Sequence, residues 1–269
     1  MMPRLWAVTW YELKMRWRSG GYWLVVLLVN AWALFVASPL NYRSDTDWPL
    51  FRSSWWMAGQ AFNAATVLMA GLGAFLVADR MLRDRTLETW ECLRARGVFP
   101  GAYVLGKWAS SALSLFLAVC PLLVGTPLVQ WHVSHTVPQF WPFFLAWATE
   151  YVPVILFASA LALSAATLLG DARLFYVPYL VVWYLDSFQW WVPRPAIREV
   201  LNFNGTAVLF GLIATHVPDW AARYPSIATW EALLNLGLLV TASGALLLIL
   251  WRRERGKWLG SAALQRSGR

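Results

Sequence analysis

Residues 101–107, with the sequence GAYVLGK, have the residue types and spacing of a loop that binds the phosphates of a nucleotide. Such a G-x-x-x-x-G-K loop follows a strand, and the Ser or Thr that comes next holds magnesium through its hydroxyl. Here Trp108 occupies that next position, no strand precedes the motif, and a long apolar segment follows it. The sequence therefore predicts that this chain binds no nucleotide and has no ATPase machinery of its own.

Metal-binding and catalytic patterns are equally incomplete. His132 and His135 are separated by two residues, but a catalytic zinc takes three protein ligands, so we interpret both as surface-loop residues and predict no metal site. The chain has no G-x-S-x-G, no H-E-x-x-H and no pair of mid-segment aspartates. This disfavours an intramembrane enzyme.

Glu150 lies deep within an apolar segment. A charge inside a membrane is costly and marks a functional site by default. Because Pro153 disrupts the helix nearby, a position in an outer vestibule is an equally good interpretation. Asn30, Gln60 and Asn63 also lie in apolar segments. With Glu150 they are candidates for a substrate pathway, although hydrogen bonding between helices is the commoner role of such amides.

Six apolar segments must position these residues. The 269-residue chain is 59% hydrophobic and 13% charged, whereas soluble domains have about 25% charged residues. About 20 apolar residues cross a bilayer, and in lipid such a segment forms a helix. The segments are 22–39, 55–78, 108–129, 141–169, 174–192 and 230–251. We predict an all-α polytopic membrane protein with six transmembrane helices in one domain, residues 21–269.

The charges orient this domain. If the first end is cytoplasmic, 17 of the 22 Lys and Arg residues lie on the inner side and five on the outer side. This split follows the positive-inside rule, so we expect a multi-pass protein of the cytoplasmic (inner) membrane with both termini in the cytoplasm. The net charge of +8 then reflects orientation and attraction to anionic membrane lipids, and we predict no nucleic-acid partner.

Residues 1–20 form a separate element. Trp6, Trp10, Leu13 and Trp17 recur at helical spacing, and Arg4, Tyr11, Lys14 and Arg18 follow the opposite face. This pattern predicts an amphipathic helix lying in the membrane interface, which the Gly20–Gly21 pair ends.

The uncharged stretch 200–217 is long enough for a seventh span. A seventh span would place the basic C-terminal segment outside, against the positive-inside rule. We therefore interpret residues 197–225 as a re-entrant or interfacial outer element between the fifth and sixth spans.

The cytoplasmic loop 79–107 is the most charged part of the chain. Within it we predict a short helix over 86–96, capped by Asp84 or Thr86, ended by Gly97 and followed by Pro100. A helix this short is marginal alone in water, so we expect something to dock against it.

This loop, DRMLRDRTLETWECLRARGVFPGAYVLGK, resembles the cytoplasmic loop of ABC-2-type permeases, the membrane subunits of ABC exporters. That family shows a charged cluster, then G-T-L-E, a Leu, a Pro and a G-K that opens the third span. The matching residues, in order, are Thr86, Leu87, Glu88, Leu93, Pro100, Gly106 and Lys107, while Arg85 stands where the family has glycine. The amphipathic start, the six spans and the outer element also resemble this family.

The resemblance implies that two permease subunits, in a homodimer or a related heterodimer, bind two separate ATPase subunits that carry ATP and magnesium. The helix 86–96 would be the coupling helix that inserts into the ATPase. The residues implied in coupling are Arg83, Asp84, Thr86, Leu87, Glu88, Trp90, Glu91 and Arg94. The alternatives are a channel or secondary transporter, which should couple through buried titratable residues, and less favourably a membrane enzyme.

Overall fold

The computed structural model describes residues 2–38, 53–78, 80–87, 89, 93, 95–188 and 229–267. Every regular element among these residues is a helix, which confirms the all-α prediction for this part of the chain. Five described helical segments are long and apolar enough to cross a membrane. They are Gly20–Ala37, Ser54–Asp84, Pro100–Ser134, Phe140–Leu169 and Leu233–Lys257, and they overlap five of the six predicted spans.

The remaining predicted span, 174–192, overlaps helix α10 (Ala172–Phe188). This helix has 17 described residues, and the end of the predicted span lies outside the described part. The outer element predicted over 197–225 also lies outside it. That the chain crosses the membrane six times therefore stays a prediction.

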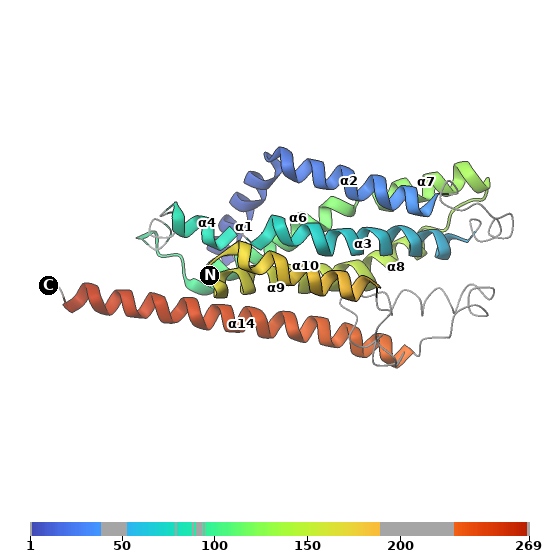
Figure 1. The fold of residues 1–269 in the computed structure, drawn as a ribbon. Helices are drawn as coiled ribbons and strands as arrows, with labels where there is room; N and C mark the ends of the chain where they lie inside the picture. The colour runs from blue at the N-terminus through green and yellow to red at the C-terminus, as the bar shows by residue number, and fades with distance from the viewer. Residues whose placement is uncertain are drawn as a thin grey trace.

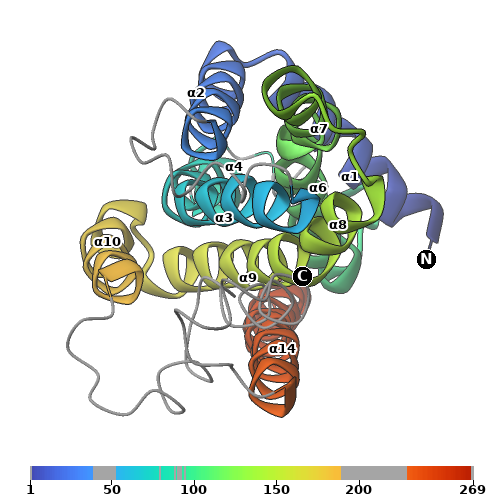
Figure 2. The same ribbon diagram turned by 90° about the vertical axis from the view of Figure 1, so that its right-hand side faces the viewer.

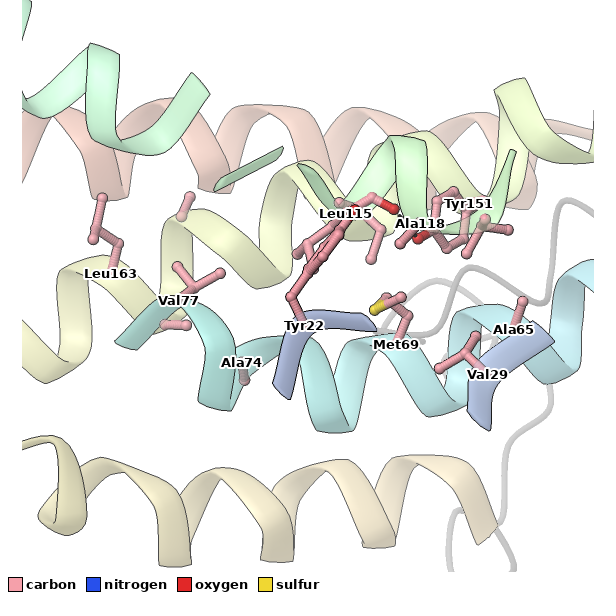
Figure 3. Close-up of a cluster of buried hydrophobic side chains, with 14 of the residues drawn as sticks. Tyr22, Val29, Ala65, Met69, Ala74, Val77, Leu115, Ala118, Tyr151 and Leu163 are labelled. Carbon is pink, nitrogen blue, oxygen red and sulfur yellow. Dashed lines mark hydrogen bonds between the residues drawn. The ribbon is translucent and has the colours of Figure 1, made fainter. Parts of the chain in front are cut away.

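Helices α3 (Ser54–Ala78) and α9 (Val152–Leu169) form the centre of the bundle and pack against each other. Helix α2 (Gly20–Ala37) covers α3, and the long helix α14 (Thr229–Ser267) covers α9, as the end-on view in Figure 2 shows. Small side chains such as Ala65 and Ala74 let the helices approach closely, while Met69, Leu115 and Leu163 fill the space between them (Figure 3).

Two of the long segments contain a local break. Helix α6 (Pro100–Val119) is followed by α7 (Leu122–Ser134) across Pro121. Helix α8 (Phe140–Ala146) continues through a turn of π-helix, η3 (Trp147–Tyr151), directly into α9. Pro153 stands just after this turn and contributes no N–H to the helical hydrogen bonds, which accounts for the change in winding at that point.

Some predicted boundaries differ from the structure. Helix α1 (Met2–Trp17) ends before Ser19, which has an extended backbone, and Gly20 and Gly21 begin α2 instead of separating the two helices. Helix α4 (Arg80–Thr86) ends at the residue where we predicted a helix to begin. Helix α14 continues to Ser267, well past the predicted span end at residue 251.

Candidate functional site

Helix α1 packs along the first half of α6, and Gly106 makes this close packing feasible. A Cβ atom at Gly106 would lie 2.8 Å from Cγ1 of Val8 and 3.3 Å from the backbone carbonyl oxygen of Leu5. The Thr9 hydroxyl donates to the Gly106 carbonyl oxygen at 3.4 Å. A glycine is therefore required at this position by the approach of α1.

An ionic cluster lies next to this contact. Lys107 Nζ is 2.5 Å from Oε1 of Glu12 and 2.7 Å from Oδ2 of Asp84. The Tyr103 hydroxyl donates to the same Asp84 oxygen at 2.8 Å. Lys107 is only 2% exposed, so one buried ammonium group connects carboxylates from α1 and α4 to α6.

Two arginines extend the cluster. Arg80 Nη1 lies 3.8 Å from Oε2 of Glu12. Arg16 is 1% exposed and donates to the hydroxyls of Ser114 at 2.5 Å and Ser111 at 3.0 Å. Burial, and then the nearby Arg80 charge, lower the pKa of Arg16 to about 9, so the guanidinium remains charged at neutral pH.

We call these six residues the buried junction: Glu12, Arg16, Arg80, Asp84, Tyr103 and Lys107. It holds three cations and two carboxylates largely away from water. Buried charges depend on their partners. Removing one partner of a buried ion pair costs about 3–5 kcal/mol of stability, because the other charge is left uncompensated. The junction therefore resists sliding of α1, α4 and α6 past one another, and a displacement of any one of them should carry the others.

The opposite face of α1 carries an aromatic stripe. Trp6, Trp10 and Trp17 are 40–59% exposed, and the Trp6 and Trp10 rings stack with their centroids 6.3 Å apart. Exposed indole rings beside basic residues suit the lipid–water interface. Leu13, predicted on this face, is instead buried in the protein.

The predicted coupling residues lie in different settings. Asp84 lies within α4 and is buried in the junction, where its carboxylate faces Lys107. Thr86 is exposed at the end of α4, where its hydroxyl donates back to the Arg83 carbonyl oxygen. Leu87 is 64% exposed and Arg83 is half-buried. The rest, Glu88, Trp90, Glu91 and Arg94, lie outside the described residues.

The structure does not bring the predicted pathway residues into one described contact. Asn30 donates to the carbonyl oxygens of Val26 at 2.7 Å and Ala118 at 2.8 Å, and thereby joins α2 to α6. Gln60 and Asn63 are half-buried on α3. Glu150 is fully buried in η3.

The residues of the sequence motif 101–107 are helical, since they lie in the first turns of α6, which begins at Pro100. Its Lys107 is buried and held in ion pairs with Glu12 and Asp84. His135 ends α7 in a left-handed conformation, and no group of metal-binding side chains occurs within the described ranges.

Sequence reasoning missed Glu12 and Arg16, although a signal for them exists. Glu12 is the sole acidic residue of α1 and lies on the stripe Leu5, Val8, Thr9, Glu12 and Arg16, which has the spacing of one helix face.

Comparison with models of known protein families and with curated proteins found no match.

Proposed function

We propose that this chain is the membrane-spanning permease subunit of an ATP-binding-cassette exporter. In this proposal it forms the substrate pathway, spans the inner membrane six times and has both termini in the cytoplasm. The single observation that carries the proposal is the buried junction, because it gives a cytoplasmic loop a direct mechanical connection to the bundle.

The connection would work as follows. An ATPase subunit pushes on the segment that follows α4. Lys107 holds Asp84 of α4 and Glu12 of α1 at 2.7 and 2.5 Å, so a push passed on through α4 reaches α6 and the interfacial helix together. Since α6 continues into α7, the displacement is passed toward the opposite end of the bundle. The N-terminus, α4 and the C-terminal end of α14 lie toward the same end of the bundle in Figure 1, where the proposal places the cytoplasm.

The energy source in this proposal is a separate subunit. Two copies of the chain, or this chain and a related one, would bind two ATPase subunits that hold ATP and magnesium. The conformation of residues 101–107 supports this division of labour, because they are helical and Lys107 is already held in ion pairs.

A second candidate is a proton-coupled secondary transporter. The buried Glu150 carboxyl favours it, since coupling to protons needs a titratable group within the membrane. The buried junction has no evident role in that alternative.

The deciding experiment is affinity purification of the tagged chain from its native membranes in mild detergent, followed by native mass spectrometry. The proposal expects two permease and two ATPase chains, with the ATPase identified by its own phosphate-binding loop. A stable assembly that transports substrate without any ATPase chain would refute the proposal and favour the second candidate.

A further inference from the structure

Glu150 is the most isolated ionisable side chain in the described core. It is 0% exposed, and neither carboxyl oxygen has a hydrogen-bond partner. It lies in η3, on a segment that crosses the whole bundle. An unpaired carboxylate in such a place costs several kcal/mol or more, so some partner must neutralise it.

The described part of the chain places no ionisable partner beside Glu150. Helix α6 contacts η3 through the rings of Phe116 and Trp147, and its one basic residue, Lys107, is already held by Glu12 and Asp84. The helices that pack most extensively against η3 are α3, α8 and α9. Over their full described lengths, Ser54–Ala78, Phe140–Ala146 and Val152–Leu169, these helices contain no Asp, Glu, Lys, Arg or His. The neighbouring Tyr151 directs its hydroxyl to the Leu115 carbonyl oxygen at 2.6 Å instead.

The tight packing limits what the partner can be. Ala146, Tyr151 and Val154, on the two sides of Glu150 along the segment, are almost completely buried, whereas residues 147–149 and Val152 are partly exposed. A hydrated metal ion or an organic cation needs space and several ligands, and no group of metal-binding side chains is found in the described ranges. A proton needs neither.

The composition of the π-turn is compatible with a neutral carboxyl group at Glu150. Pro153 contributes no N–H, so the turn that contains Glu150 has one donor fewer than an ordinary helical turn. A neutral carboxylic acid brings an O–H donor to this turn, whereas a carboxylate brings only acceptors. π-turns within helices are frequent at functional sites.

We propose that Glu150 is a proton-binding site in the core of the bundle, where its carboxyl group carries one proton in this packed conformation. When the bundle opens toward water, the carboxylic acid releases this proton to water and becomes a carboxylate, and closing reverses the step. This inference concerns the chain by itself and does not depend on the ATPase partner.

The test is infrared difference spectroscopy of the full chain in lipid nanodiscs at neutral pH, comparing wild type with Glu150→Gln. Glutamine has the shape of the neutral acid, so the variant should fold with an unchanged melting temperature. We expect wild type to show one carbonyl band of a neutral carboxylic acid that the variant lacks. The matched control is Asp171→Asn, at an exposed carboxyl that accepts the Arg173 N–H, and it should lose carboxylate intensity alone.

Two results would overturn the proposal. One is a difference between wild type and Glu150→Gln in the carboxylate bands with none in the carboxylic acid region. The other is failure of Glu150→Gln to fold while Asp171→Asn folds normally, because a neutral isostere must fit a site that is already neutral.

Discussion

Replacing Lys107 with Met tests whether the buried junction holds the molecule together. Methionine keeps most of the length and apolar stem of lysine but removes the ammonium group, so Glu12 and Asp84 are left facing each other without the cation between them. At an effective dielectric constant of about 20, each pair is worth about 6 kcal/mol of attraction before desolvation. The cost of burying the three charges offsets much of this.

The net loss should lie at the lower end of the range for breaking a buried pair, about 3 kcal/mol in the free energy of unfolding. Glu12 retains Arg80 at 3.8 Å and Asp84 retains the Tyr103 hydroxyl, which reduces the damage. In the double variant Asp84→Asn, Lys107→Met the stranded Asp84 charge is removed, while Glu12 keeps Arg80 as its partner. We expect this variant to recover at least about half of the loss, because most of it comes from the stranded charges.

The assay is reversible unfolding in mixed micelles, with Lys14→Met as the matched control. Lys14 is an exposed cation on the same helix, and its replacement should change the free energy of unfolding by about 0.5 kcal/mol or less. If Lys107→Met were as stable as Lys14→Met, or if the double variant were less stable than Lys107→Met, the account of the buried junction would be refuted.

Two further predictions concern packing and topology. Gly106→Ala should lower the free energy of unfolding by about 1–3 kcal/mol, because the new methyl group meets Val8 and the Leu5 carbonyl. The control Gly244→Ala should not lower it, because no atom lies within 4 Å of the new methyl group. Equal effects of the two variants in thermal unfolding would refute the close packing. A cysteine introduced at Ser134 should react with an impermeant thiol reagent added outside sealed cells, whereas a cysteine introduced at Gly256 should not react. Labelling at Gly256 from outside would contradict the six-span topology.

The apolar segments could be predicted from the sequence because lipid imposes both their length and their helical form. Five of them are present as helices of sufficient length, and Glu150 was recognised as deeply placed. The helix boundaries were less predictable. Gly20 and Gly21 were expected to end a helix, yet the backbone turns one residue earlier, at Ser19, and both glycines are helical.

The buried junction could not be predicted in full, because it depends on which face of α1 meets α6. Residues such as Lys107 and Asp84 are ordinarily exposed, and only the three-dimensional contact brings them to Glu12, 95 residues from Lys107 along the chain. The aromatic stripe is the more obvious face of α1 in the sequence. The stripe that carries Glu12 and Arg16 is narrower and mixes apolar with charged residues, so its pattern is less distinct.

The central claim, that a separate ATPase acts on the segment between α4 and α6, is tested most directly with Trp90→Ala. Trp90 lies outside the described residues, and the sequence offers it as the large apolar anchor that interface hot spots favour. We expect its loss to weaken ATPase binding by about 2 kcal/mol or more, seen as reduced co-purification and reduced substrate-linked ATP hydrolysis, with normal membrane insertion. Glu88→Ala should have a smaller effect on binding. The matched control, Trp141→Ala, removes an exposed tryptophan of α8 and should leave both measurements unchanged. Wild-type co-purification and hydrolysis in both Trp90→Ala and Glu88→Ala would contradict the claim.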